Sequence, residues 1–428
     1  MSDVVATIVF VGAYVLIATE WVHRVVVVLV GAGLMLLFRF VDAEDAFHSP
    51  EFGIDWNVIF LLFGMMVIVG VLRRTGLFEY LAIWSAKRAA GRPFAVMTLL
   101  VLITAVASAL LDNVTTMLLV APVTLVIAER LGAPPVPFLL AEVFASNIGG
   151  TATLVGDPPN IIIGSAAGLS YTDFLVNLGP IVVVLLAVYL LMSRRLFADA
   201  LTFHPDRVQE VLALDERDAL QPGSLLPKAL IVLVLVTAAF VLQGVLGYAP
   251  SIVALLGAGV LLLLAGGDRT EYLRDVEWQT LVFFAALFVM VGALVKVGVI
   301  EALAERVADA SGGSLFVAMT LILFASAVLS AVVDNIPYVA TMTPLVAALT
   351  ATLPGDTTVL WWALALGADL GGNATSIGAS ANVVMLGVAE RGGHPVRFVR
   401  FARSGVPVTV VTIGIAYLYL WLRYFVLG

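Results

Sequence analysis

The stretch Ser146-Asn-Ile-Gly-Gly-Thr-Ala-Thr-Leu-Val-Gly-Asp-Pro-Pro-Asn160 places glycines, prolines and polar residues inside an otherwise apolar region. A second stretch, Ala368-Asp-Leu-Gly-Gly-Asn-Ala-Thr-Ser-Ile-Gly-Ala-Ser-Ala-Asn382, begins 222 positions later and repeats the glycine pair, a threonine, a third glycine and the final asparagine. Glycine weakens a helix, and proline removes a backbone hydrogen-bond donor. We therefore expect a helix to break at both places.

The offset of 222 positions aligns the two halves of the chain well beyond these stretches. It pairs, without a gap, Trp56 with Trp278, Gly76 with Gly298, Asp112-Asn113 with Asp334-Asn335, and Pro122 with Pro344. Shared tryptophan, proline and Asp-Asn pairs in one register indicate a duplicated unit rather than chance matching of small apolar residues. Internal duplication of this kind is common in membrane transporters.

The composition indicates a membrane protein. Of the 428 residues, 61% are hydrophobic and 12% are charged, about half the charged share of a soluble domain. Lipid-exposed backbone must satisfy its own hydrogen bonds, so apolar runs near bilayer length are expected to be helices. These runs are 4–22, 25–41, 56–72, 180–196, 226–243, 251–265, 278–295 and 404–422. They lack the alternation of a β-barrel strand.

Other compositional features exclude several classes of protein. The net charge of −8 offers no basic surface for nucleic acid. The absence of cysteine excludes disulfides and thiol chemistry. The first apolar run has no basic residue before it and no small-residue cleavage site after it, so it is expected to be a retained helix rather than a signal peptide.

Basic residues in short loops predict the orientation of each half, because such loops stay cytoplasmic. Five basic residues lie within 73–92, whereas acidic residues offset the basic ones within 296–309, the matching region of the second half. Residues 168–177 carry no basic residue, yet their counterpart at 391–403 carries four arginines. The two halves are therefore expected to have opposite orientations, which is an inverted-topology repeat.

This pattern predicts an all-α polytopic membrane protein in three parts. The first repeat covers 1–197, a cytoplasmic linker covers 198–225, and the second repeat covers 226–428. Each repeat is expected to have about five transmembrane helices, a re-entrant helical hairpin (93–130 and 314–353) and a broken helix (136–168 and 357–389). The charge pattern alone also allows hairpins that span the membrane fully. Both termini are predicted to be external, in a multi-pass protein of the cell membrane.

Polar residues cluster in the hairpins and broken helices, where they are costly unless they serve a function. The candidate substrate- and ion-binding residues are Asp112, Asn113, Thr115, Thr116, Asn147, Gly149, Gly150, Thr151, Thr153, Asp157 and Asn160 in the first half, and Asp334, Asn335, Asp369, Gly371, Gly372, Asn373, Thr375, Ser376 and Asn382 in the second. Broken helices expose backbone groups that can replace the hydration shell of an ion or hold an oxyanion. Two alternatives remain open: the small residues pack helices closely, and Asp112 and Asp334 cap helices at a membrane interface.

The charge inventory favours a cation. Four aspartates, Asp112, Asp157, Asp334 and Asp369, fall in the motifs, which contain no arginine or lysine. Carboxylates without a fixed cation suit Na⁺ or H⁺, whereas a multiply charged anion would need helix dipoles or bound cations. We expect no metal site beyond a Na⁺ site at these residues. The halves differ in sequence, because Asn147 aligns with Asp369 and Asp157 with Ala379; one half is therefore expected to handle the coupling ion and the other the substrate.

These motifs, and their order in both halves, resemble the ion transporter superfamily, specifically the branch of the arsenite permeases and the melanosomal P protein. The runs that carry the resemblance are Leu111-Asp-Asn-Val-Thr-Thr-Met-Leu-Leu, Asn147-Ile-Gly-Gly-Thr-Ala-Thr and Gly156-Asp-Pro-Pro-Asn-Ile-Ile, and it extends over nearly the whole chain. NhaD sodium–proton antiporters and dicarboxylate transporters are more distant relatives. The resemblance implies a scaffold and a transport part in each half, a site between hairpin tips and unwound helices, and a homodimer. Dicarboxylate members carry Ser-Asn-Thr at the hairpin tips, which this chain lacks, so carboxylate substrates are disfavoured.

The resemblance predicts an ion-coupled secondary active transporter, an efflux permease for arsenite or antimonite that works by alternating access. Arsenite is largely an uncharged oxyacid at neutral pH, so hydroxyls, amides and carboxylates could bind it. The alternative is a sodium–proton antiporter that uses the buried aspartates. A channel is disfavoured because no repeated selectivity filter is visible. An enzyme is disfavoured because the four histidines (His23, His48, His204 and His394) all fall in predicted loops.

The expected partners follow from these predictions. The coupling ion is H⁺ or Na⁺, and no organic cofactor is expected. A small inorganic ion is the expected substrate, and membrane lipid surrounds the protein. No nucleic acid is expected to bind, and a partner ATPase remains an open alternative.

Overall fold

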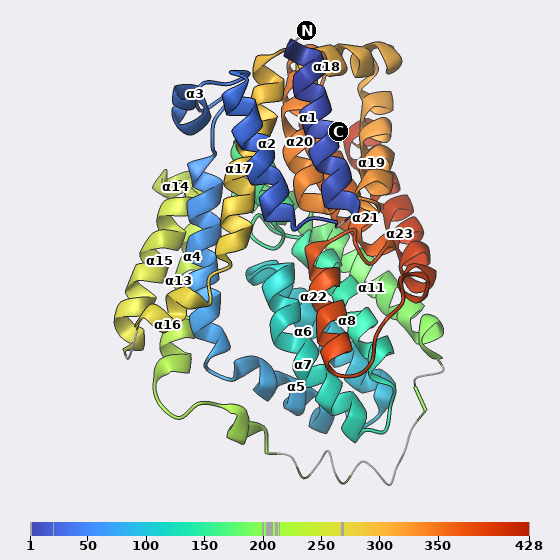
Figure 1. The fold of residues 1–428 in the computed structure, drawn as a ribbon. Coiled ribbons are helices and arrows are strands. Elements are labelled where there is room, and N and C mark those ends of the chain that lie inside the picture. Colours follow the sequence, from blue (N-terminus) through green and yellow to red (C-terminus); the bar gives the residue numbers. More distant parts are fainter. Residues whose placement is uncertain are drawn as a thin grey trace.

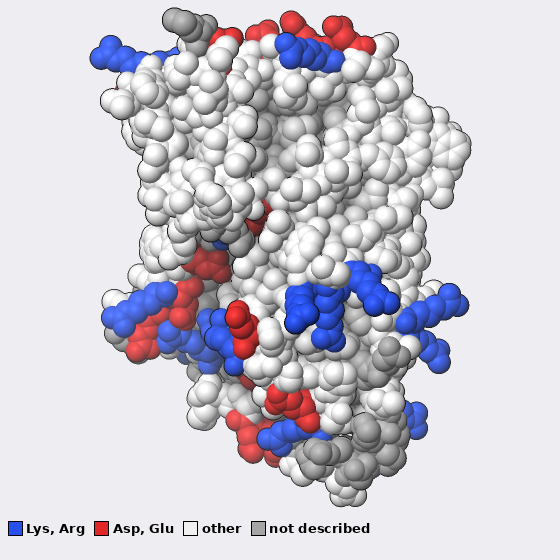
Figure 2. All heavy atoms as spheres, turned by 45° about the vertical axis from the view of Figure 1, so that its right-hand side comes forward, with Lys and Arg blue, Asp and Glu red and all other residues white. Residues whose placement is uncertain are grey.

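The computed structural model describes residues 2–19, 21–198, 201–202, 209, 213, 215–266 and 269–427. These residues form helices and no strand. Seven of the helices are at least 18 residues long and apolar enough to cross a membrane. Figure 2 shows a broad surface band without charged side chains between a charged upper rim and a charged belt lower down. The predicted class, an all-α polytopic membrane protein, is confirmed.

The two repeats contain matching series of helices. The first repeat contains α1 (Ser2–Thr19), α2 (Arg24–Leu37), α3 (Ala43–His48), α4 (Trp56–Arg73), α5 (Leu77–Arg88), α6 (Pro93–Leu110), α7 (Asn113–Arg130), α8 (Pro135–Gly150), α9 (Pro158–Ala167), α10 (Tyr171–Asn177) and α11 (Gly179–Leu196). After the 3₁₀ turn η3 (Glu216–Ala219), the second contains α13 (Leu225–Val241), α14 (Gln243–Leu246), α15 (Pro250–Ala265), α16 (Arg269–Arg274), α17 (Trp278–Lys296), α18 (Val299–Ala310), α19 (Leu315–Ser330), α20 (Asn335–Thr352), α21 (Thr358–Gly371), η4 (Gly372–Ala374), α22 (Ser380–Arg391), α23 (Phe398–Trp421) and η5 (Leu422–Val426).

The repeats are inverted and interlocked. The α6–α7 hairpin opens toward the bottom of Figure 1, and the α19–α20 hairpin opens toward the top. Within the repeats, α6 packs on α8 as α19 packs on α21. Between the repeats, α4 packs on α15 and α2 packs on α17. Each of these helix pairs therefore contains one helix from each repeat. The scaffold is therefore shared by both halves of the chain.

Equivalent hydrogen bonds join each hairpin to its broken helix. The Ser108 hydroxyl donates to the carbonyl of Ser146 (2.7 Å), and that of Ser330 donates to the carbonyl of Ala368 (2.6 Å). The Thr153 hydroxyl likewise donates to Ala109, at the end of α6, and its equivalent in the second repeat makes the matching bond to the end of α19. The hairpin tips are thus fixed to the helix breaks, and they lie inside the fold as re-entrant hairpins do.

Glycines allow the close contacts between these elements. A Cβ on Gly371 would lie 2.6 Å from the carbonyl oxygen of Ala327 on α19, and one on Gly149 would clash with the carbonyl of Ala105 on α6. A Cβ on Gly372 would lie 2.8 Å from the carbonyl oxygen of Gly378. Only glycine permits such an approach of two backbones, which is the usual way helices pack tightly in a membrane.

The predicted linker is only partly described. Arg207 and His204 lie outside the described residues. The Lys87 ammonium forms an ion pair with Glu216 and holds the pKa of that carboxyl below its ordinary value. The described part of the linker is thereby attached to α5. Both chain ends lie in the upper half of Figure 1, and η3 lies at the bottom. Which end faces the cytoplasm stays a prediction.

Candidate ion-binding site

The two hairpin tips meet at one carboxylate, Asp157. This residue precedes α9, and its side chain is 1% exposed. The Asn113 amide, on the first residue of α7, donates to Asp157 at 2.6 Å. The Asn335 amide, on the first residue of α20, donates to the same carboxylate at 3.3 Å. Hairpins that enter from opposite ends of the molecule are therefore joined through a single acidic group.

A network of buried asparagines extends from this carboxylate. The Asn113 amide also donates to Asn147 at 3.2 Å. The Asn147 amide donates to Asn373 at 2.9 Å and to Asn382 at 3.1 Å, so it joins the two repeats. The Asn382 amide donates to the carbonyls of Gly372 and Thr375, both at 2.8 Å. Side-chain amides thus hold the broken segment where helical hydrogen bonds are missing.

The same arrangement fixes the break in the first repeat. The Asn160 amide donates to the carbonyl of Thr153 at 3.0 Å. The Thr151 hydroxyl donates to the carbonyl of Asn147 at 2.8 Å. The Asn160 and Thr151 side chains both lie next to Asp369, but they donate their hydrogen bonds to these backbone carbonyls instead. Among the described residues, neither carboxylate oxygen of Asp369 has a hydrogen-bond partner, although the side chain is fully buried.

Among the described residues, the buried side-chain atoms that lack a hydrogen-bond partner are all oxygens. Within the described part of the chain, every buried side-chain nitrogen has a hydrogen-bond partner, and the atoms without one are oxygens. They belong to Thr104, Asn113, Thr116, Glu142, Asn160 and Asp369. Oxygen ligands suit hard cations, and Asp369 and Asp157 are close enough to repel each other when both are charged. The centre is therefore rich in acceptors and in negative charge.

Asp112 and Asp334 are N-cap residues of the second hairpin helices. Asp112 accepts from the backbone N–H of Thr115 at 2.7 Å and from its hydroxyl at 2.6 Å. Asp334 accepts from the backbone N–H of Ile336 at 3.0 Å. The capping alternative is therefore correct as to geometry. The same alternative places the two caps at a membrane interface. That part is wrong, because the capped helix ends lie at the centre of the fold beside Asp157.

The expectation that the site has no fixed cation is wrong. Arg24, the first residue of α2, lies 3.3 Å from the carboxylate of Asp334 and donates to the hydroxyl of Ser380 at 3.0 Å. Its guanidinium also lies over the ring of Phe283, 5.5 Å from the centroid. The motifs themselves contain no basic residue, but the α1–α2 connection brings one to the second hairpin. The signal in the sequence was a lone arginine between two apolar runs, which resembles an ordinary loop residue.

The remaining candidates have packing roles or no polar contact. Gly149, Gly150, Gly371 and Gly372 provide the close backbone contacts, and Thr153 and Thr375 tie the breaks to the hairpins. Thr115 belongs to the Asp112 cap. Thr116 and Ser376 are buried, but neither joins the asparagine network. The structure brings together Asn113, Asn147, Asp157, Asn335, Asp369, Asn373 and Asn382.

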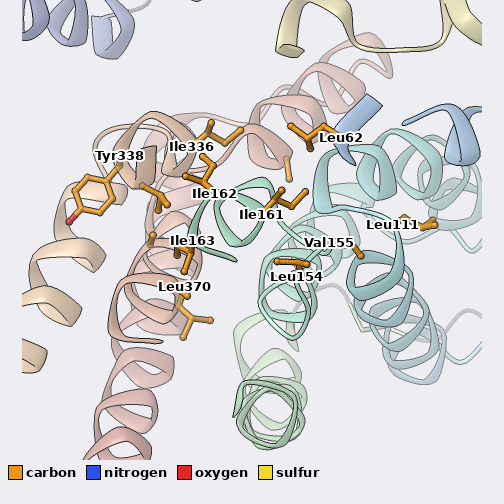
Figure 3. Packing of buried hydrophobic residues seen from close by; sticks show 14 of the residues in the cluster. Leu62, Leu111, Leu154, Val155, Ile161, Ile162, Ile163, Ile336, Tyr338 and Leu370 are labelled. Atoms are coloured by element: carbon orange, nitrogen blue, oxygen red, sulfur yellow. The ribbon is translucent and has the colours of Figure 1, made fainter. Parts of the chain in front are cut away.

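Two cavities flank this centre at equivalent places in the two repeats. One, of about 720 Å³, is lined by Trp278 and Val384 and reaches Arg24 and Asp334. The other, of about 1040 Å³, is lined by Trp56 and Ile162, which are the counterparts of Trp278 and Val384, and extends along α17 and α20. Between them, Figure 3 shows the apolar side chains of α9 beside Ile336 of α20. Ile162 thus belongs both to the lining of the second cavity and to this apolar packing.

Loss of Arg24 should weaken the contact between the α1–α2 connection and the second hairpin. We expect Arg24→Gln to lower stability by about 1 kcal/mol, because the Arg24 side chain is 39% exposed and solvent screens the pair. The measurement is thermal unfolding in detergent. Arg73→Gln is the matched control, since Arg73 is exposed at the end of α4. Equal melting temperatures for the two variants would contradict the assignment.

Inverted repeats, opposed hairpins and broken helices around a buried polar centre define a membrane transporter. A model of the citrate transporter family (CitMHS) matches residues 14–367, and the chain belongs to this family. It is 57% identical over 427 residues to an uncharacterised transporter of Mycobacterium tuberculosis, with 99% of each chain covered. It is 36% identical over 514 residues to the human P protein, covering 99% of this chain and 60% of the P protein. The suspected superfamily and P-protein branch are thereby confirmed.

A solved structure has the same fold. The YdaH transporter of Alcanivorax borkumensis superposes with a TM-score of 0.60 at 16% sequence identity, covering 85% of each chain. This likeness concerns the arrangement of helices. It agrees with the transporter names of the relatives in sequence.

Proposed function

We propose that this protein is a secondary active transporter that binds its coupling cation, Na⁺ or H⁺, at Asp157 and Asp369. The observation that carries the proposal is that Asp157 accepts amide hydrogen bonds from both hairpin tips. A cation at this carboxylate competes for the same oxygens, so its binding changes how firmly the two hairpins are joined. A ligand shifts a conformational equilibrium only through such a difference between states.

The two cavities support alternating access. Each approaches the centre beside one broken helix, and the repeats that line them are inverted. Exchange between two states that open one cavity and close the other would expose the same central oxygens to the two sides of the membrane in turn. A channel would need both to be open at once.

Sodium–proton exchange is the form of transport that these groups support best. Among the described residues, Arg24 pairs with Asp334 and no cation pairs with Asp157 or Asp369. Na⁺ or H⁺ would neutralise the charge of these two carboxylates. The second candidate is export of arsenite or antimonite. The neutral trihydroxide has only hydroxyl donors to offer, which match the unpartnered oxygens around Asp369, but it brings no positive charge.

Reconstituted vesicles distinguish these candidates. The protein is placed in sealed proteoliposomes with an imposed pH gradient, and the collapse of the gradient on Na⁺ addition is compared with arsenite movement in the same vesicles. Collapse by Na⁺ without arsenite movement supports the exchanger. Arsenite accumulation that follows the gradient while Na⁺ alone has no effect supports the permease. If neither ion changes the gradient, the proposed coupling is wrong.

A further inference from the structure

A buried acid on α8, Glu142, lies outside the central site. Its side chain is 1% exposed. One carboxylate oxygen accepts from the hydroxyl of Thr124 on α7 at 2.7 Å, and the other has no partner among the described residues. Glu142 precedes Asn147 by five residues, which is about 8 Å along the helix axis. It is the eighth of the sixteen residues of α8, halfway between the α7–α8 connection and the helix break.

Packing at this position does not require an acid. The offset of 222 positions places Leu364 and Val346 at the equivalents of Glu142 and Thr124. Both are fully buried, in helices that pack as α8 and α7 do. The same location is therefore filled by two apolar side chains in the second repeat. The first repeat carries an acid and a hydroxyl instead, at a cost that an apolar pair avoids.

Among the described residues, no cation pairs with Glu142. Tyr189 on α11 is the titratable group that faces it, and the Tyr189 hydroxyl donates to the neighbouring carbonyl of Ala141 at 2.8 Å. The charged groups on the helices packed against α8, with α11 included, are Glu129, Arg130, Arg194, Arg195, Asp369, Glu390, Arg391, Arg400 and Arg403. Within the described residues none of them forms an ion pair with Glu142. The neutral acid, which gains a donor, suits such surroundings better than the carboxylate.

We propose that Glu142 is a proton-binding site of the transport cycle. Its unpartnered oxygen takes up a proton from water to give the neutral acid, and it returns the proton to water when the carboxylate reforms. Only an O–H bond forms and breaks. The inference rests on the proposed cation coupling, and it adds a second proton-binding position to the central carboxylates. Because the second repeat has Leu364 there, only the first repeat carries this acid.

Infrared difference spectroscopy tests protonation of Glu142 without knowledge of the cargo. The reconstituted wild-type protein is compared with Glu142→Gln across a pH step. We expect a carbonyl band of a protonated carboxylic acid in the wild type that is missing from Glu142→Gln and kept in Asp157→Asn. An identical set of bands in wild type and Glu142→Gln overturns the proposal. This result stands even if the vesicles show no sodium–proton exchange, so failure of the proposed function is seen separately.

Transport measurements supply the second readout. We expect Glu142→Gln to lower sodium-driven proton flux roughly tenfold and to flatten its pH profile, as loss of an acid–base group does, whereas Glu142→Asp should keep the profile. The double variant Glu142→Leu with Thr124→Val rebuilds the apolar pair of the second repeat and should therefore keep the wild-type melting temperature. A double variant that folds and keeps the wild-type pH profile overturns the proposal.

Discussion

Sodium-driven proton movement should fall roughly 100-fold in Asp157→Asn, near the upper range of coupling between linked sites. Asparagine keeps the shape of the side chain and can still accept one amide hydrogen bond. It carries no negative charge, so neither Na⁺ nor H⁺ gains from binding there, and the link between Asn113 and Asn335 no longer depends on the cation. The measurement is the decay of an imposed pH gradient in proteoliposomes after addition of Na⁺.

The matched control for this variant is Glu44→Gln. Glu44 is an exposed acid in α3, so the change removes the same charge away from the centre. We expect wild-type exchange in the control and a normal melting temperature in both variants. Exchange by Asp157→Asn at the wild-type rate would show that the cation binds elsewhere.

Gly371→Ala should cause a large loss of stability. The added Cβ would lie 2.6 Å from the carbonyl oxygen of Ala327, a backbone atom that cannot move without shifting α19. Overpacking of this kind costs about 3 kcal/mol, which corresponds to a fall of roughly 5 °C in the apparent melting temperature. Thermal unfolding in detergent, followed by loss of the monodisperse protein, measures the effect.

Gly259→Ala provides the comparison. Gly259 also lies inside a helix, α15, but a Cβ there meets no atom within 4 Å. Alanine favours a helix over glycine by about 1 kcal/mol, so the melting temperature should stay the same or rise slightly. Similar falls in melting temperature in both variants would contradict the account that Gly371 is needed for the close contact between α19 and α21.

Local and repeated features of the fold could be predicted from the sequence. The helix breaks follow from glycine and proline in apolar segments, and the inverted repeat follows from one offset that pairs Trp56 with Trp278. Asp157 could also be selected as a candidate, since a carboxylate in an apolar stretch is costly, and the structure places it between the two hairpin tips. These inferences use residues that are close in sequence or related by a fixed spacing.

Contacts between distant segments could not be predicted. Arg24 and Asp334 are 310 positions apart, and nothing in either motif indicates that the α1–α2 connection reaches the second hairpin. The exchange of partners between α2, α4, α15 and α17 depends on how side chains fit across the repeats. Glu142 is not predicted by the polar clusters, because this acid stands alone in an apolar helix.

Cysteine labelling tests the central claim, that cation binding at Asp157 decides which cavity is open. The chain contains no cysteine, so single cysteines can be introduced without removing others. Val383→Cys reports on the cavity beside Arg24, where Val383 is 45% exposed, and Ala347→Cys reports on the cavity along α20. Labelling is measured with a membrane-impermeant maleimide with and without Na⁺.

We expect Na⁺ to change the labelling of the two positions in opposite directions, and Asp157→Asn to remove the response at both. Simultaneous labelling of both positions, unaffected by Na⁺ or by Asp157→Asn, would contradict alternating access around this carboxylate.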